Sequence, residues 1–292
     1  MPMPPKKSTR PWHAGWRALG AGLLGAALMA GCATLDEQQR RWIFQPGTRT
    51  WASGSVDGLQ DVWIDFNSAA LHQPVRLHGL WLPQADADAP VLLYLHGARW
   101  DVRSSAHRMR RMHEMGFAVL GIDYRGFGLS TDTLPSEDEA QEDARAAWRW
   151  LGQARPASQR YLFGHSLGGA IAVRLASEVD DEAGLIVEGS FTSIADVVAT
   201  FRWGWLPLGP FITQRFDAAS HIGRVGSPVL VVHGSDDQLI SPALGQALYE
   251  RATSPKRFVL VEGGSHHNTH AVGQPLYRQA IADLFGLSTT AR

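Results

Sequence analysis

A six-residue turn, Gly-His-Ser-Leu-Gly-Gly at 164–169, constrains the fold of this chain more than any other feature. It follows the apolar run at 161–163 and precedes the helical pattern at 170–176, which predicts a strand, a sharp turn and a helix in succession. In a Gly-x-Ser-x-Gly turn the glycines remove side chains that would clash, and the serine takes a strained backbone conformation. Ser166 would then project its hydroxyl outward, and the Leu167 amide, at the positive end of a helix, would favour an oxyanion. The turn suits nucleophilic attack, although its last two glycines could also serve only to pack a helix on a strand.

A serine hydroxyl is a weak nucleophile unless an imidazole accepts its proton and a carboxylate orients that imidazole. Both groups occur downstream, each after an apolar run that predicts a buried parallel strand. The run at 229–232 leads into His-Gly-Ser-Asp-Asp at 233–237, and the run at 258–261 leads into Glu-Gly-Gly-Ser-His at 262–266. Since open parallel sheets place their chemistry at the carboxyl ends of strands, we expect both strand ends to lie near Ser166.

Strand and helix patterns alternate along the rest of the chain, which predicts an α/β fold. The runs at 62–66 and 77–81 are expected to form an early antiparallel pair, whereas the later, continuously apolar runs are expected to be buried on both faces. The predicted fold class is a mostly parallel eight-stranded sheet flanked by helices, with a small cap insertion. Strands are expected near 59–67, 75–82, 91–95, 117–122, 160–163, 184–188, 228–233 and 257–262, and helices near 104–115, 138–152, 167–178, 242–252 and 274–285.

Further motifs are spread over most of the chain. They are Trp-Ile-Phe-Gln-Pro at 42–46, Tyr-Leu-His-Gly at 94–97, Asp-Tyr-Arg-Gly-Phe-Gly-Leu-Ser at 123–130, Glu-Gly-Ser-Phe-Thr-Ser at 188–193, the serine turn and the loop at 233–237. With these motifs the chain, from about Arg40 onward, resembles the α/β-hydrolase superfamily, and more narrowly its Bem46-like or ABHD-like serine hydrolases. The resemblance implies the α/β-hydrolase fold and a mechanism through an acyl-enzyme that requires no cofactor.

The resemblance also implies roles for individual residues. The carboxylate of the family is usually the fourth residue after the histidine of a His-Gly pair, which is Asp237, with Asp236 as the alternative. The family's histidine follows a glycine-rich turn, which matches His266, with His267 adjacent as the alternative. Together with Ser166, these residues would form the catalytic triad.

The histidines at the other strand ends are expected to have different roles. In similar hydrolases the backbone amide after a His-Gly pair is the second oxyanion donor, which implies that the Ala98 amide joins that of Leu167. His96, His165 and His233 each stand at a strand end beside a glycine, and we expect them to hydrogen-bond neighbouring loops rather than transfer protons.

The insertion between the strands ending near 188 and beginning near 228 is roughly forty residues long, more than a simple crossover requires. We expect a cap there, at about 191–226. Its segment at 201–211 is dense in apolar residues. These side chains could line an acyl pocket, pack on the domain itself, or contact a membrane.

A serine hydrolase that cleaves carboxylic esters, including lipid or thioester acyl groups, is the expected function. A serine aminopeptidase of the S33 type is an alternative that would need an acidic subsite, for which Glu188 and Asp196 are candidates. Another alternative is a non-catalytic envelope protein that binds a ligand on the same scaffold, but such a protein would be expected to lack a triad member. His266, His267 and His270 could suggest a metal site, yet no His-Glu-x-x-His set is present and the triad explains His266 without a metal.

The amino terminus predicts export. Four basic residues precede the uncharged stretch at 18–30, and Leu-Met-Ala-Gly-Cys at 28–32 resembles the cleavage site of bacterial lipoproteins. Cys32 is the only cysteine, so lipidation there is expected, with an ordinary signal peptide or a short uncleaved anchor as alternatives. The mature protein would then lie in the bacterial cell envelope, on the outer membrane facing the periplasm if the organism is Gram-negative, with the membrane as a partner through the lipid.

Composition narrows the class of partner and the number of domains. The 27 Lys and Arg residues balance 28 Asp and Glu residues, so no basic field for nucleic acid is present. The length favours one large domain. The expected divisions are a lipoprotein-type signal peptide at 1–31, a linker and lead-in segment at 32–58, and a hydrolase domain at 59–292.

Overall fold

The computed structural model describes residues 31, 33–48, 56–155, 159–202 and 204–287. The chain divides into two compact units, Met1–Gln39 and Arg40–Arg292. The described part of the first unit is helical, and the second unit holds the sheet. Apart from Gly31, the expected signal peptide lies outside the described residues, as does Cys32. None of the described helices combines the length and the apolar character needed to cross a membrane.

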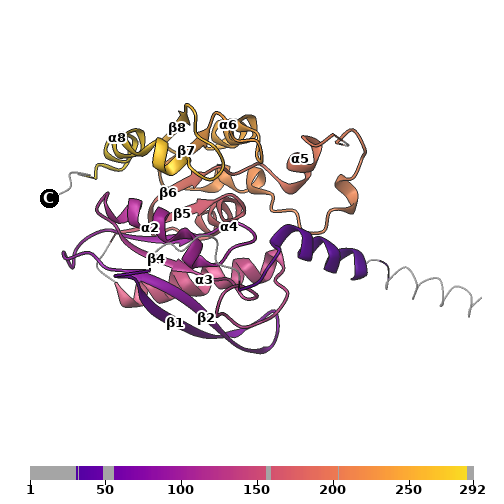
Figure 1. The fold of residues 1–292 in the computed structure, drawn as a ribbon, viewed down its shortest axis with the longest axis horizontal. Helices are drawn as coiled ribbons and strands as arrows, with labels where there is room; N and C mark the ends of the chain where they lie inside the picture. Colours follow the sequence, from indigo (N-terminus) through magenta and orange to yellow (C-terminus); the bar gives the residue numbers. More distant parts are fainter. Residues whose placement is uncertain (1–30, 32, 49–55, 156–158, 203, 288–292) are drawn as a thin grey trace, which may run out of the picture. The chain divides into compact units, whose positions relative to one another are not determined.

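All eight expected strands are present in the described residues, and they form one sheet (Figure 1). They are β1 (Gln60–Ser68), β2 (Gln73–Leu82), β3 (Val91–Leu95), β4 (Ala118–Ile122), β5 (Arg160–His165), β6 (Glu182–Glu188), β7 (Val229–Gly234) and β8 (Lys256–Val261). Their order is β1-β2-β4-β3-β5-β6-β7-β8. The early antiparallel pair is confirmed, with Ile64 opposite Leu77. β2 also pairs antiparallel with β4, and the remaining neighbours pair parallel.

Helices connect most of the strands, and all of them match the ranges expected from the sequence except the short helices α5 and α7, which were not predicted. The helices are α2 (Ala106–His113), α3 (Glu137–Ala154), α4 (Leu167–Ala176), α5 (Ile194–Ala199), α6 (Pro242–Arg251), α7 (Thr269–Val272) and α8 (Gln274–Phe285). The helix expected near 104–115 differs in one respect, because the chain first forms a 3-10 turn, η1 (Val102–Ser105). The Asp101 carboxylate accepts a hydrogen bond from the Ser104 amide at 3.2 Å, which favours this tighter turn before α2 begins.

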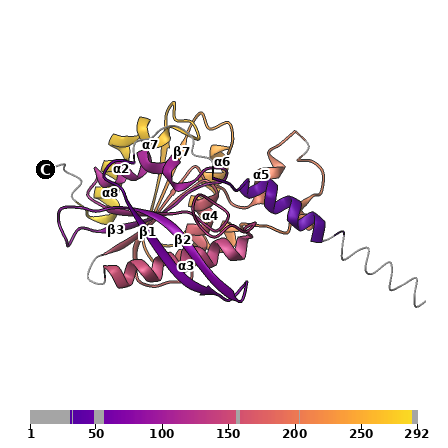
Figure 2. The same ribbon diagram turned by 60° about the horizontal axis from the view of Figure 1, so that its bottom comes forward.

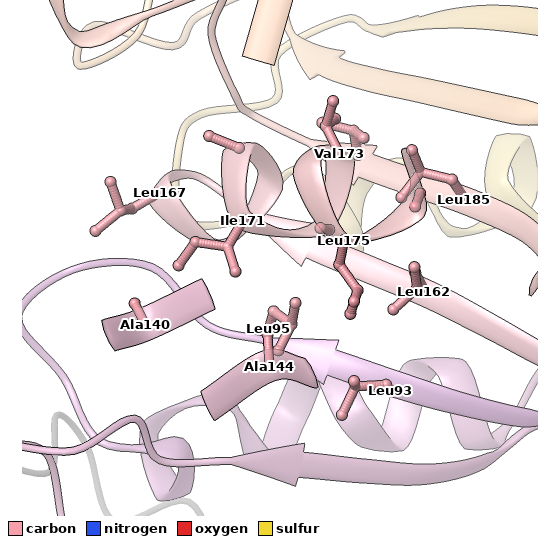
Figure 3. Packing of buried hydrophobic residues seen from close by; sticks show 14 of the residues in the cluster. Leu93, Leu95, Ala140, Ala144, Leu162, Leu167, Ile171, Val173, Leu175 and Leu185 are labelled. Carbon is pink, nitrogen blue, oxygen red and sulfur yellow. The ribbon is translucent and has the colours of Figure 1, made fainter. Parts of the chain in front are cut away.

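The core lies on both faces of the sheet, because neighbouring residues of a strand point to opposite faces. Leu93 and Leu95 of β3 belong to the cluster that also contains residues of α3 and α4 (Figure 3). Leu92 and Tyr94 of the same strand belong to the cluster that contains residues of α2 and α8. Burial on both faces explains why the parallel strands are apolar throughout rather than alternating.

The segment between β6 and β7, where the sequence predicts a cap, is mostly irregular. It contains α5 and the 3-10 turns η2 (Gly209–Phe211), η3 (Ala218–Ser220) and η4 (Ile222–Arg224). Figures 1 and 2 both show α5 and the loop after it projecting from the sheet on the side opposite α8. The chain then returns to β7.

Candidate active site

Ser166 stands in a strained turn between β5 and α4. Its backbone angles are φ 55° and ψ −121°, a conformation that residues with a side chain rarely adopt. Hydrogen bonds on both sides hold the turn: the Ser166 amide donates to the Glu188 carbonyl at 2.9 Å, and the Ser190 hydroxyl donates to the Ser166 carbonyl at 2.8 Å. Leu167 is the first residue of α4, so its amide lies at the positive end of the helix.

The glycines around Ser166 are required by close backbone approaches. A Cβ atom at Gly164 would lie 2.3 Å from the Gly168 carbonyl oxygen, and one at Gly168 would lie 2.2 Å from the Leu95 carbonyl oxygen. The loop after β3 also lies close to the turn, since a Cβ atom at Gly97 would lie 3.0 Å from the Ser166 Cβ. The turn therefore packs against the end of β3, the strand that leads to Ala98.

The structure brings Asp237 and His266 together from the ends of β7 and β8. His266 Nδ1 lies 2.8 Å from Asp237 Oδ2, and both residues are buried. The other carboxylate oxygen accepts hydrogen bonds from the amides of Leu239 at 2.9 Å and Ile240 at 2.8 Å. Both oxygens of the carboxylate are therefore engaged, which fixes its position beneath the imidazole.

Asp236 and His267, the alternatives for the acid and the histidine, do not take part in the contact between Asp237 and His266. Asp236 is exposed and accepts a hydrogen bond from the hydroxyl of Ser235 at 2.9 Å. His267 is also exposed, and its ring meets that of His266 edge-on at a centroid distance of 5.3 Å.

His233 supports the same carboxylate. Its Nε2 atom lies 3.3 Å from Asp237 Oδ2 and 3.0 Å from the Ile240 carbonyl oxygen. Burial raises the pKa of the Asp237 carboxyl, but hydrogen bonds from His233 and His266 outweigh burial and hold this pKa below its ordinary value. Asp237 is therefore an anion at neutral pH, the state needed to stabilise a positively charged imidazole.

Ser166 and His266 face one cavity of about 240 Å³. Ala98 and Leu239 belong to its wall, as do His96 and several residues of the loop after β3. The complete lining is His96, Gly97, Ala98, Arg99, Trp100, Ser104, Ser105, His107, Arg108, His165, Ser166, Leu239, His266 and His267. Within the described residues the lining contains no carboxylate and no member of the segment between β6 and β7.

Comparisons with known proteins show which family the chain resembles. An uncharacterized protein of Mycobacterium tuberculosis strain CDC 1551 is 35% identical over 272 residues, 91% of this chain and 94% of that protein. Lysophosphatidylserine lipase ABHD12 of Danio rerio is 31% identical over 186 residues, which cover 57% of this chain and 48% of the lipase. The family described as serine aminopeptidase, S33, matches residues 86–209. The chain belongs to the α/β-hydrolase superfamily.

Solved structures share the fold of this α/β-hydrolase. The Pyrococcus furiosus esterase Pf2001 superposes with a TM-score of 0.63 at 21% identity, over 82% of this chain and 97% of the esterase. Est1E from Butyrivibrio proteoclasticus, solved with ferulic acid bound, gives 0.62 at 17% identity, over 73% of this chain and 96% of Est1E. At these identities the neighbours show the fold, and together with the relatives in sequence they describe a Bem46/ABHD-like α/β-hydrolase.

Arg108 is a part of the hydrolase site that sequence reasoning missed. Its side chain is buried, and its Nη2 atom donates to the carbonyls of His266 at 3.2 Å and His267 at 3.1 Å. Its Nε atom donates to Glu188 Oε1 at 2.9 Å, and the other oxygen of Glu188 accepts from the Tyr277 hydroxyl. A charged side chain from α2 therefore holds the backbone of the loop that carries His266.

The Arg108 and Glu188 pair is charged in the folded hydrolase. Burial, the largest single cause, raises the pKa of Glu188, but the positive charge of Arg108, with hydrogen bonds from Tyr277 and Arg108 among the smaller causes, holds this pKa below its ordinary value. Glu188 is one of the two acids considered for an amine-binding subsite, and the structure commits it to Arg108. The other, Asp196, accepts hydrogen bonds from the hydroxyls of Thr192 at 2.5 Å and Ser193 at 2.8 Å, within the first turn of α5.

Uncharged histidines surround the site. His165 lies beside His266, with a ring centroid distance of 4.9 Å, and burial followed by the charge of Arg108 lowers the pKa of His165 well below its ordinary value. Burial likewise lowers the pKa of His96, whose Nδ1 lies 2.6 Å from the Gly97 carbonyl oxygen. His165 thus contacts the loop that carries His266, with its Nε2 3.0 Å from the His266 carbonyl oxygen, whereas the polar contact of His96 is with the next residue of its own loop. Among the described residues, no group of three or more His, Cys, Asp or Glu side chains is arranged to hold a metal ion.

Proposed function

We propose that this hydrolase cleaves carboxylic esters with Ser166, His266 and Asp237 as its catalytic triad. The observation that carries the proposal is the 2.8 Å contact between His266 Nδ1 and Asp237, at a cavity that also contains the strained Ser166. With Nδ1 committed to Asp237, Nε2 of His266 is left to accept the Ser166 proton. A separation between serine and imidazole that exceeds a hydrogen bond is common before substrate binds.

The reaction then proceeds in two halves. Ser166 attacks the ester carbonyl as His266 takes its proton, and the amides of Leu167 and Ala98 stabilise the tetrahedral oxyanion. The carbon–oxygen bond to the alcohol breaks, and the alcohol leaves with the proton from His266. Water, deprotonated by His266, next attacks the acyl-enzyme, the bond from the acyl carbon to Ser166 breaks, and His266 returns the proton to Ser166 as the acid leaves. Asp237 stabilises the imidazolium in both halves, and no cofactor is needed.

Three observations favour esters over the alternatives. The relatives and structural neighbours include a lysophosphatidylserine lipase and esterases, which points to ester or lipid acyl groups. An aminopeptidase would need a carboxylate near the bound amine, whereas the cavity lining in the described residues has none. A non-catalytic binding protein does not require the intact set of Ser166, Asp237 and His266.

Export to the cell envelope is the second part of the proposal. Residues 1–31 would be a lipoprotein-type signal peptide and Cys32 the lipidated residue, followed by a lead-in segment at 32–58. The hydrolase domain would span 59–292, with a cap at about 191–226. Metabolic labelling with a fatty acid tests this: the wild-type chain should be labelled and Cys32→Ser should not.

A fluorophosphonate probe tests the catalytic proposal. We expect the full chain to react covalently with the probe, Ser166→Ala to lose labelling, and Ser105→Ala to keep it. Ser105 is a matched control, because it lines the same cavity without standing in the elbow. Hydrolysis of p-nitrophenyl esters should follow the same pattern. Equal labelling of the wild type and Ser166→Ala would contradict the proposal.

A further inference from the structure

Among the described residues, five large apolar side chains are exposed on the loop that follows α5. Their exposed fractions are 43% for Phe201, 74% for Trp205, 37% for Leu206, 39% for Leu208 and 64% for Phe211. We call these five residues the β6–β7 patch. Single exposed apolar side chains are ordinary, but several together on one projecting loop indicate an interaction site.

Neither packing in the core nor lining the acyl pocket accounts for the β6–β7 patch. Its exposure shows that Trp205 and Phe211, the two largest contributors, do not pack into the core. The cavity that contains Ser166 has no lining residue from the segment between β6 and β7. The patch therefore presents apolar surface to solvent and belongs neither to the core nor to the lining of the cavity.

The charges beside the patch identify its partner. Arg202 and Arg215 are both exposed, and the sequence has no Asp or Glu between Asp196 and Asp217. A carboxylate from elsewhere in the chain reaches this segment, that of the half-buried Glu137, which accepts a hydrogen bond from the Arg215 amide at 2.7 Å. The complete chain, in contrast, has nearly equal numbers of acidic and basic residues. Aromatic and aliphatic side chains beside arginines, without acids, are typical of surfaces that enter the headgroup region of a bilayer.

A second copy of the chain is a poorer partner on the same evidence. In a symmetric dimer the patch would face itself, so Arg202 and Arg215 would face the same arginines. The segment offers no carboxylate to pair with them. We propose that the β6–β7 patch docks on the surface of an anionic lipid bilayer, with Trp205 and Phe211 inserted among the headgroups and the two arginines near the lipid phosphates.

A fluorescent label on the patch tests this proposal independently of catalysis. In the full chain, Cys32→Ser removes the only cysteine, and Phe211→Cys then carries a single environment-sensitive label. Val272→Cys in the same background is the matched control, because Val272 is also an exposed apolar residue, at 48%, and belongs to α7. The probe membranes are phosphatidylcholine vesicles with and without phosphatidylglycerol.

The label at 211 should brighten several-fold and shift to the blue with vesicles that contain phosphatidylglycerol, and the label at 272 should stay in water. Arg202→Gln with Arg215→Gln should weaken the response at 211 by about thirtyfold in lipid concentration, since each arginine near an anionic surface contributes about a factor of five. These two substitutions alter exposed side chains, so circular dichroism should be unchanged.

Three results would overturn the proposal. The label at 211 could remain in water while the chain sediments with the vesicles through its amino terminus. Both labels could respond equally, which would indicate nonspecific adsorption. The label at 211 could respond without vesicles and with increasing protein concentration, which would indicate a second copy as the partner. Each result leaves the triad proposal untouched, because no step depends on Ser166.

Discussion

Replacing Arg108 by methionine should strongly destabilise this hydrolase, because it leaves the Glu188 carboxylate buried without its counter-charge. The Arg108 and Glu188 side chains are only 7% and 1% exposed and lie 2.9 Å apart. Removal of one partner of such a buried pair costs about 3–5 kcal/mol, a large part of the free energy of unfolding of a typical domain. The Arg108→Met substitution also removes hydrogen bonds to the His266 and His267 carbonyls.

Removal of both charges separates the cost of the orphaned charge from the loss of positioning. In Arg108→Met with Glu188→Gln no buried charge is left, so we expect the double variant to recover about 2–3 kcal/mol relative to Arg108→Met alone. Activity should not recover with stability, since neither variant holds the His266 loop. A small displacement of a catalytic group can reduce the rate by about a hundredfold.

Urea unfolding and kcat/KM for a p-nitrophenyl ester, measured on the same preparations, decide the matter. Arg145→Met is the control, because Arg145 pairs with Glu178 at 2.8 Å with about a third of each side chain exposed. Such a surface pair contributes less than about 1 kcal/mol. If the double variant is as unstable as Arg108→Met, the charge argument fails. If it is stable and fully active, Arg108 does not position His266.

Three further predictions concern the Asp237 carboxylate, the turn at Ser166 and stability at low pH. Asp237→Asn should lower kcat by up to about 10⁴-fold, because the imidazole loses its orienting anion, whereas Asp236→Asn should stay within a few-fold in steady-state kinetics. Gly168→Ala should lower both the melting temperature and labelling by the fluorophosphonate probe, because its Cβ would lie 2.2 Å from the Leu95 carbonyl oxygen, and an unchanged melting temperature would contradict this. Burial lowers the pKa of His270 from 6.5 to about 3, so between these pH values the unfolded chain binds a proton that the folded chain does not, and stability falls as the pH decreases. Between about pH 7 and about pH 5, the free energy of unfolding of His270→Phe, measured with urea, should therefore fall by about 2 kcal/mol less than that of the wild type. Equal decreases would refute the assignment of this pH dependence to His270.

The fold could be predicted from the sequence because its signals are local. Each parallel strand is a short apolar run buried on two faces. The antiparallel pair at the edge of the sheet could likewise be recognised from its local sequence pattern, which differs from that of the buried strands. The elbow is equally local, since the clashes that exclude a Cβ atom arise within residues 164–168 and at Leu95. The helix near 104–115 was less well predicted, because the hydrogen bond from the Ser104 amide to Asp101 converts its beginning into a 3-10 turn.

The site was only partly predictable for a physical reason. Adjacent residues such as Asp236 and Asp237 have the same chemistry, and only the path of the loop after β7 decides which of them meets His266. Arg108 carries no local signal at all. Its partners lie 80 residues away at Glu188 and 158 residues away at His266, so the contact arises only when α2 packs against the sheet.

Glu188 explains how two residues a hundred positions apart keep a fixed relation. Its backbone carbonyl accepts a hydrogen bond from the Ser166 amide, and its carboxylate accepts one from Arg108. Arg108 in turn donates a hydrogen bond to the His266 carbonyl. Ser166 and His266, which we propose as nucleophile and base, are thus both connected to the end of β6, one through the backbone and one through a side chain. Only the second connection can be removed by substitution, because Glu188→Gln keeps the backbone carbonyl. A Glu188 variant should therefore disturb the position of His266 more than that of Ser166, and proton transfer should be affected more than the geometry of the elbow.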